Sequence, residues 1–346
     1  MAAPFDTSSL SISGSVIPFI DSVRTEVVAH APQYTISDNG TLVYVPGLPA
    51  DLGHLTKVRA LGDIEKLDFL PEIYGQMDVS PDGRKLAITV QESVGSSKWI
   101  YDLEAGARSL FARETDLVVS SVWTPDSEAI LYTDEVDTPN GVRHRVRVRR
   151  LGETESNTLY ETPALVRITS TSLDGRLVFG YNETQVFALV LENGIVADTL
   201  VYTSEESRNW GPSVSPDGRY IAYTNLDEGR SIIHVQSTTP GGRVCQVSPD
   251  GGEEPKWSPG GDKLYYSRGQ TWFEVPVQTR AGFSFGRSQR IFSGRYLNVP
   301  GFGYDVFPDD SGFLVIEGAY QDSLVTELKA LINFDQMLRE VAPAND

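Results

Sequence analysis

The 346-residue sequence is poor in the residues that most often build reactive centres. It holds one cysteine, Cys245, so no internal disulfide can form. Its four histidines are well separated, and no His-x-x-x-His, His-x-His or Cys-x-x-Cys pair is present, which disfavours a preformed zinc site. The Gly-x-Ser-x-Gly elbow, the phosphate loop and the dinucleotide fingerprint are missing as well. The motifs therefore assign no catalytic residue and predict neither a metal site nor a cofactor.

Long apolar runs and an excess of positive charge are also missing. No apolar stretch approaches the length that spans a bilayer. Met1–Asp6 has neither the basic region nor the apolar region of a signal peptide. We therefore expect a soluble chain without membrane insertion. Lysine and arginine number 29 against 47 aspartates and glutamates, a net charge of −18, which disfavours nucleic acid as a partner. The basic run Arg143–Arg150 is expected to form a solvated strand face.

What the sequence does contain is a repeated turn. Ser-Pro-Asp-Gly occurs intact at Ser80–Gly83 and Ser215–Gly218, and degenerate copies occur between and beyond these two. Successive copies lie 43 to 49 residues apart, with β-rich runs on both sides. A period in the forties with several strands per unit predicts an all-β protein, a β-propeller. The third positions of the seven copies are Asn39, Asp82, Asp126, Asp174, Asp217, Gly260 and Asp309.

The chemistry of this turn indicates a structural role. Proline presets φ, aspartate bonds the backbone two residues on, and glycine accepts the positive φ that closes the turn. A turn that recurs in every unit cannot mark one active site. We therefore interpret the repeated residues as determinants of architecture.

Seven copies predict seven four-stranded blades in a single domain of residues 1–346. The last unit lacks an outer strand, and Ser15–Ile20, within the segment 1–24, is expected to supply it and close the ring. A six-bladed ring is the alternative if the unit at Asn39 or at Asp309 is degenerate. The expected blades lie near 25–72, 73–116, 117–163, 164–207, 208–251, 252–295 and 296–334, followed by a tail at 335–346.

The segments that enter each inner strand are expected to ring one mouth of the central channel. They carry aromatic, cationic and anionic residues, a mixture suited to stacking and charge-assisted hydrogen bonds with a peptide, a protein segment or a small ligand. A non-enzymatic binding module is the leading hypothesis. The candidate ligand-binding residues are His30, Tyr74, Arg167, Arg208, Trp210, Glu253 and Phe302.

Two other functions stay open. A lyase or hydrolase could use His30, Tyr74, Arg208 or Glu253 as acid, base or charge stabiliser. A protein-contact scaffold could use the sides of the blades. Calcium is a weaker candidate ligand at Asp134–Asp137 or at Asp309 and Asp310, because neither follows a calcium-loop spacing.

The repeated turn and the strand after it resemble those of TolB-like propellers. A narrower likeness is carried by Val23–Thr25, Ser37–Gly47, Gly251–Pro259 and Leu331–Arg339. Through these stretches the chain resembles the sensor propeller of bacterial serine/threonine protein kinases. That resemblance implies sensing or protein contact and an extracytoplasmic location. The sequence has no kinase motif, so it would be a domain excised from a membrane-anchored kinase or a stand-alone relative.

Overall fold

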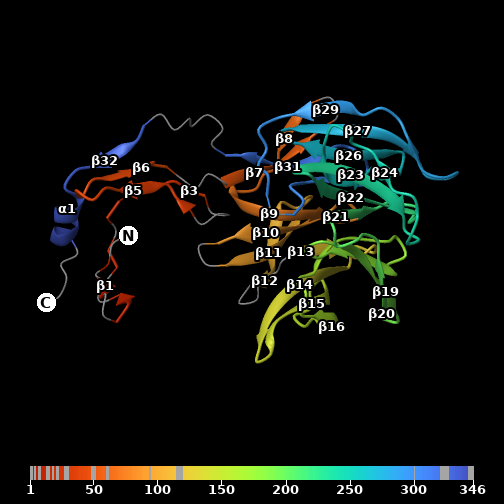
Figure 1. Ribbon diagram of the computed structural model, residues 1–346, viewed down its shortest axis with the longest axis horizontal. Coiled ribbons are helices and arrows are strands. Elements are labelled where there is room, and N and C mark those ends of the chain that lie inside the picture. The colour runs from red at the N-terminus through yellow and green to blue at the C-terminus, as the bar shows by residue number, and fades with distance from the viewer. Residues whose placement is uncertain are drawn as a thin grey trace. The chain divides into compact units, whose positions relative to one another are not determined.

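The structure is a computed structural model (Figure 1). Its residues form two compact units, one of 1–52 with 318–346 and the other of 53–317. Strands dominate both units, and the described residues include one α-helix, α1 (Phe334–Val341). None of the described helical residues forms a span long and apolar enough to cross a bilayer. The described residues are 3, 5–6, 9–12, 16–17, 19–20, 23–26, 31–47, 52–59, 62–92, 95–113, 120–299, 301–319 and 327–341.

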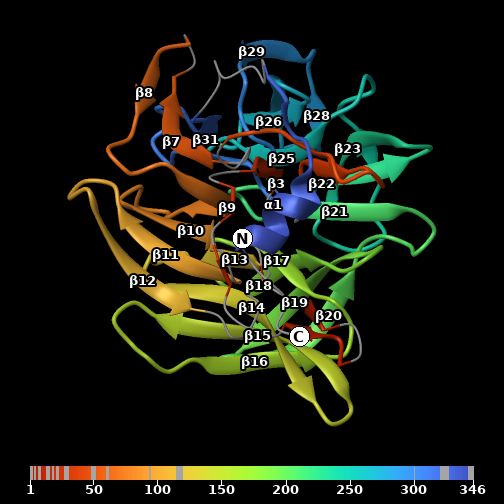
Figure 2. The same cartoon turned by 90° about the vertical axis from the view of Figure 1, so that its left-hand side faces the viewer.

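The 53–317 unit is built from antiparallel sheets of successive strands. Figure 2 shows these sheets following one another around a common centre, with β9, β13, β17, β21 and β25 innermost. Three of them have four strands each. They are β13 (Ser120–Trp123), β14 (Ala129–Thr138), β15 (Gly141–Arg150) and β16 (Asn157–Thr162); β17 (Arg167–Thr171), β18 (Leu177–Tyr181), β19 (Val186–Glu192) and β20 (Ile195–Val201); and β21 (Arg208–Val214), β22 (Tyr220–Asp227), β23 (Arg230–Ser237) and β24 (Cys245–Gln246).

A five-stranded sheet comes next along the chain. Its innermost strand, β25, precedes the turn at Ser258, and β29 pairs with β27 at its outer side. Its strands are β25 (Glu253–Trp257), β26 (Lys263–Arg268), β27 (Thr271–Gln278), β28 (Ser284–Phe285) and β29 (Gln289–Ser293).

An eight-stranded sheet completes the unit and contains two four-stranded groups. The strands of one group follow one another in the sequence. The other group pairs the last two strands of the unit with its first two strands. The strands are β9 (Glu72–Val79), β10 (Lys85–Gln91), β11 (Ser96–Asp102) and β12 (Ala107–Arg113), then β30 (Tyr304–Val306), β31 (Phe313–Gly318), β7 (Leu52–Val58) and β8 (Ile64–Lys66).

Burial follows the position of a strand within its sheet. The second strand β10 is buried along its centre, because it lies between neighbouring sheets. The outermost strand β20 is mostly exposed. Burial is therefore high in the second strand of a sheet and low in its outermost strand.

Hydrogen bonds link the inner strand of each group of four or five strands to that of the next group, and the series returns to its start. Among the described residues of the unit there are six such groups, each with at least one link to the next. The links, named donor first, are Val79 N to Asp305 Oδ2, Trp123 N to Asp78 Oδ2, Ile168 N to Ser120 Oγ, Thr169 Oγ1 to Pro212 O, Trp257 Nε1 to Ser213 O and Tyr304 OH to Glu254 O.

The ring closes differently from the sequence prediction. The outer strands of the closing group are β7 and β8, whereas the prediction gave the outermost position to residues 15–20, of which 15 and 18 lie outside the described part of the chain. Gly53 permits the close approach, because a Cβ there would stand 2.3 Å from Ile316 Cγ2. The count of seven blades is not confirmed, since the described sheets of 53–317 supply six groups.

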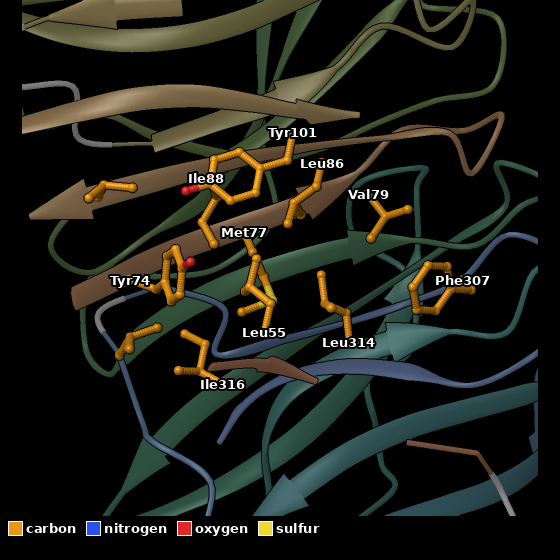
Figure 3. Packing of buried hydrophobic residues seen from close by; sticks show 12 residues of the cluster. Leu55, Tyr74, Met77, Val79, Leu86, Ile88, Tyr101, Phe307, Leu314 and Ile316 are labelled. Atoms are coloured by element: carbon orange, nitrogen blue, oxygen red, sulfur yellow. The ribbon is translucent and has the colours of Figure 1, made fainter. Parts of the chain in front are cut away.

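A hydrophobic cluster holds the closing group against the group of β9–β12. Figure 3 shows Leu55 of β7 beside Leu314 and Ile316 of β31, facing Met77 of β9 and Leu86 of β10. All five are 0% or 1% exposed. Each such side chain stabilises the fold by roughly 1.5–3 kcal/mol relative to exposure, so packing reinforces the closure that the strand pairing makes.

The smaller unit contains the turn at Asn39. Strands β5 and β6 flank this turn, and β32 pairs with β6 rather than with the last propeller sheet. The Phe334 N–H donates to Gly40 O at 2.7 Å, which fixes α1 to the turn. The strands are β1 (Phe5–Asp6), β2 (Ser11–Ile12), β3 (Thr25–Glu26), β4 (Ala31–Pro32), β5 (Tyr34–Ile36), β6 (Leu42–Tyr44) and β32 (Lys329–Leu331).

Candidate functional site

A cavity of about 650 Å³ lies where the inner strands β17, β21 and β25 begin. We call it the mouth pocket. The first residue of each of these strands, Arg167, Arg208 and Glu253, lines it. The remaining lining residues are Leu165, Tyr181, Asn182, Glu183, Asn209, Trp210, Leu226, Ser231, Glu254, Asn298, Val299 and Gly301.

Strand alternation explains how β21 presents its residues. Arg208 and Trp210 are two apart and share one face, while Asn209 between them is buried at 1% exposure. The Asn209 Nδ2 donates to Thr184 O at 2.9 Å and to Ser207 O at 2.8 Å, and its Oδ1 accepts from Asn225. Asn209 thereby fixes the strand end that carries the exposed Arg208.

Arg167 contributes a cation with an unused donor. It pairs with Tyr181 in the β17–β18 register, and its side chain is partly buried. Its Nε is buried and has no hydrogen-bond partner among the described residues. A buried N–H without an acceptor costs free energy, about 1–3 kcal/mol, so this group favours any ligand that supplies one.

Glu254 is a buried acid with a strained backbone. It has φ of 57°, and the equivalent position of the preceding sheet, four residues before the turn serine, is Gly211 with φ of 63°. A side chain in this conformation costs about 1 kcal/mol or more, and such strain is concentrated at functional sites. Burial raises the pKa of Glu254 to about 8, although its Oε2 accepts from Gly303 N. At neutral pH the carboxyl is therefore largely protonated.

A second charged cluster lies deeper among the inner strands. The Lys256 Nζ is 3.0 Å from Asp305 Oδ1, with side chains 13% and 9% exposed. Burial and repulsion from Asp305 raise the pKa of Asp78 to about 7. Burial alone would lower the pKa of Lys256, but Asp305 and Asp78 raise it above its ordinary value, so the ammonium keeps its charge.

Four of the seven predicted ligand-binding residues line the mouth pocket: Arg167, Arg208, Trp210 and Glu253. Phe302 follows the lining residue Gly301 but is itself 2% exposed, with Lys256 Nζ 4.3 Å from its ring centre. It fills the interior beside Gly211, whose missing side chain leaves space for the ring. Phe302 thus supports the pocket and does not present a surface to a ligand.

Tyr74 lies elsewhere, and its placement corrects the prediction that it belongs to the mouth. It is 2% exposed, packs in the cluster of Figure 3, and donates its OH to Leu70 O at 2.7 Å. Tyr74 and the buried Asn209 each lie six residues before the serine of the following turn. Strand alternation therefore turns both side chains inward. His30 lies outside the described residues.

The sequence reasoning overlooked the contribution of Asn182 and Glu183. They belong to the hairpin between β18 and β19, where Asn182 Oδ1 accepts from Thr184 N and Gln185 N. In an antiparallel sheet this hairpin lies at the same end as the segment entering the inner strand. The order of strands could therefore have indicated it.

The repeated turns lie at the other end of the inner strands. The Oδ1 atoms of Asp82, Asp126, Asp174 and Asp217 each accept from the Ser or Thr hydroxyl two residues before and from the N–H two residues after. Asp309 accepts from Ser311 N, and Asn39 from Ser37 Oγ. At Gly260 the acceptor is displaced, because Ser258 Oγ donates to Asp262 Oδ1 at 2.9 Å. These are the hydrogen bonds of a structural turn.

Two of the acidic residues considered for calcium accept hydrogen bonds within the chain, and Asp134–Asp137 lies in strand β14. Asp134 is 1% exposed and accepts from Arg145 through both oxygens and from Arg147, so these arginines form an ion-pair network instead of the expected solvated face. Asp310 Oδ1 accepts from Tyr265 OH. The described residues contain no group of three or more His, Cys, Asp or Glu side chains that could hold a metal ion.

The closed series of antiparallel four-stranded groups defines a β-propeller. Its neighbours are TolB-like propeller proteins. A solved structure assigned as TolB from Agrobacterium tumefaciens matches with a TM-score of 0.60 and 16% identity, over 77% of this chain and 98% of that one. TolB from Acinetobacter baumannii matches with a TM-score of 0.51 and 18% identity, over 72% and 66%. Hydrazine synthase of Kuenenia stuttgartiensis gives 0.54 and 16%, over 92% and 99%.

At these identities the likeness shows the fold alone. No protein-family model matches the sequence. The uncharacterized peptidase YuxL of Bacillus subtilis (strain 168) is 32% identical over 155 residues, which are 43% of this chain and 21% of that protein. The chain thus spans about a fifth of that relative's length. The predicted TolB-like propeller is confirmed as a fold, and the narrower kinase-sensor resemblance stays a prediction.

Proposed function

We propose that the chain is a binding module that takes an extended peptide or protein segment into the mouth pocket. The observation that carries this proposal is that one cavity of about 650 Å³ collects Arg167, Arg208, Trp210 and Glu253. Ligand pockets have volumes of roughly 300–1,000 Å³. Arginine and tryptophan are also the residues that most often dominate binding energy at interfaces.

The character of the lining favours a segment with both polar and apolar groups. Leu165, Leu226 and Val299 supply apolar wall, while Asn182 and Asn298 supply amide donors and acceptors. A peptide backbone needs both kinds of contact, since its N–H and C=O groups must stay hydrogen-bonded when water is displaced.

The enzyme alternative has less support. Of the four residues considered for it, Arg208 and Glu253 line the mouth pocket, but Tyr74 is committed to a core hydrogen bond and His30 lies outside the described residues. A catalytic pair must reach one substrate position, and Tyr74 does not line this pocket. Binding is therefore the better supported function. The resemblance to kinase sensor propellers is consistent with this role and extends it to sensing.

The test is capture of short synthetic peptides of random sequence by the immobilised full chain. We expect peptides enriched by the wild type to be lost with Trp210→Ala and with Arg208→Ala, by at least about tenfold each. Trp99→Ala is the matched control, because Trp99 is a partly buried tryptophan that does not line the mouth pocket. Circular dichroism and melting temperature establish that each variant folds. Equal enrichment by wild type and Trp210→Ala, or no enrichment over bare resin, would overturn the proposal.

A further inference from the structure

We propose that Arg167 and Arg208 together anchor a carboxylate group of the ligand. This inference rests on the proposed function and adds the chemical class that the mouth pocket selects. The two arginines begin the adjacent inner strands β17 and β21 and line the same cavity. The lining of this cavity therefore includes two arginines from adjacent inner strands.

Neither arginine has a carboxylate partner within the described part of the chain. Some other arginines of this acidic protein are paired: Arg145 and Arg147 with Asp134, and Arg108 with Glu72. Further arginines lack an ion pair as well, so what distinguishes Arg167 and Arg208 is that both line one cavity. The buried, unpartnered Nε of Arg167 identifies a donor that awaits an acceptor.

The acids in the same pocket do not neutralise this pair. Glu254 is 5% exposed, accepts from Gly303 N, and is largely protonated at neutral pH because burial raises its pKa. Glu253 begins β25, and the exposed Glu183 lies in the hairpin between β18 and β19. Neither forms an ion pair with Arg167 or Arg208. The positive charge of Arg167 and Arg208 therefore remains available to a ligand.

Guanidinium geometry selects a carboxylate among anions of peptides. Arginine presents parallel N–H donors that match the two oxygens of a carboxylate, and these charge-assisted bonds are about twice as strong as neutral ones. In a peptide this group is either the C-terminal carboxylate or an Asp or Glu side chain. Trp210, on the same face as Arg208, offers an aromatic surface to the residue beside it.

The experiment compares three pools of random short peptides on the immobilised full chain. The first pool has free C-termini and lacks Asp and Glu. The second has amidated C-termini and contains Asp and Glu. The third is amidated and lacks both. Each pool is applied to the wild type, Arg167→Gln, Arg208→Gln and the control Arg176→Gln. Arg176 is exposed and does not line the mouth pocket, so its substitution changes net charge equally without touching the site.

Two outcomes support the anchor. Enrichment of the first pool by wild type and Arg176→Gln, with a loss of at least about tenfold in Arg167→Gln and Arg208→Gln, identifies a C-terminal carboxylate. The same pattern with the second pool identifies an acidic side chain. Equal capture of all three pools, unchanged in the two pocket variants, overturns the anchor while peptide binding stands.

A final arm separates this inference from the proposed function. If no pool is enriched by the wild type, peptide binding fails, and the melting temperature is measured with N-acetyltryptophan and with its amide. A ligand that binds the native state raises the melting temperature. A shift with the acid alone, lost in Arg208→Gln and kept in Arg176→Gln, retains the anchor. No shift, or equal shifts with acid and amide, overturns it.

Discussion

The two ends of the inner strands obey different rules. At the turn end, Asp82, Asp126, Asp174 and Asp217 make the same pair of hydrogen bonds in four sheets. At the mouth end, the position five residues before each turn holds residues of every character. Repetition therefore marks the positions that build the fold, and its loss marks the positions free to serve a ligand. In the sequence of the 53–317 unit these positions hold Gly75, Val119, Arg167, Trp210, Glu253 and Phe302, and Arg167, Trp210 and Glu253 line the mouth pocket.

The pKa shifts of carboxyl groups at the two ends also have opposite directions. Hydrogen bonds from Thr124 and Ser172 hold the pKa of Asp126 and Asp174 below the ordinary value. At the mouth end, burial raises the pKa of Glu254 to about 8. Turn carboxylates are thus stabilised in the charged form, whereas Glu254 is stabilised in the neutral form.

The largest effect is expected between the two ends, at Lys256. Replacing Lys256 with Met leaves Asp305 and Asp78 without their buried countercharge, which should lower the free energy of unfolding by about 3 kcal/mol. Urea denaturation at neutral pH measures the change.

A double-mutant cycle controls for lost packing at Lys256. Lys256→Met combined with Asp305→Asn should cost less than the sum of the single substitutions, by about 1 kcal/mol or more. Additive costs would show that Lys256 and Asp305 do not stabilise each other. The buried charges would then act independently, as the separate turn carboxylates do.

The next effect is the pH dependence that Glu254 confers. Its pKa is raised in the folded state, so its stabilising contribution is complete below the unfolded pKa and is lost as the pH rises through about 8. Between about pH 5 and pH 8 the wild type should lose about 2 kcal/mol more stability than Glu254→Gln. Urea midpoints across this range measure the difference.

The neighbouring acid provides the control for that measurement. Glu253→Gln removes a carboxylate from the same strand end but should keep most of the pH dependence, because Glu254 remains buried. Lys256 stays charged in both variants, and Asp78 contributes the same slope to each. Parallel curves for wild type and Glu254→Gln would show that Glu254 does not titrate in this range.

The sequence predicts local structure well and long-range pairing poorly. Turn chemistry is local, so the turn at Asn39 was found, yet its strands pair with β32 in the smaller unit and not with a propeller sheet. The closing strand β7 was missed because Gly53, His54 and Lys57 make it look polar. Which strand closes a ring depends on non-local contacts such as that of Gly53 with Ile316.

The candidate site could be predicted where strand alternation was applied and not where it was ignored. Arg208 and Trp210 share a face and both line the mouth pocket. Tyr74, one position out of phase, is buried. The strained Glu254 carries no sequence signal except that the preceding sheet has Gly211 at the equivalent position.

The smallest effects are expected at the turn end, and they should be uniform. Asp126→Ala, Asp174→Ala and Asp217→Ala each remove an acceptor from a hydroxyl and an N–H, so each should cost about 1 kcal/mol. Because the pKa of these residues is lowered, their stabilisation is present above about pH 4 and is lost as the pH falls through the folded value, opposite in sign to Glu254.

The exception within the repeat sharpens this last test. The turn at Gly260 has no aspartate at the third position, and Ser258 Oγ donates to Asp262 Oδ1 instead. If the hydrogen bond and not the sequence position stabilises the turn, Asp262→Ala should cost about as much as Asp217→Ala, roughly 1 kcal/mol, by urea denaturation. A cost near zero would mean that this turn is held by its glycine and proline alone. The turn at Gly260 would then differ from the others in energetics as well as in sequence.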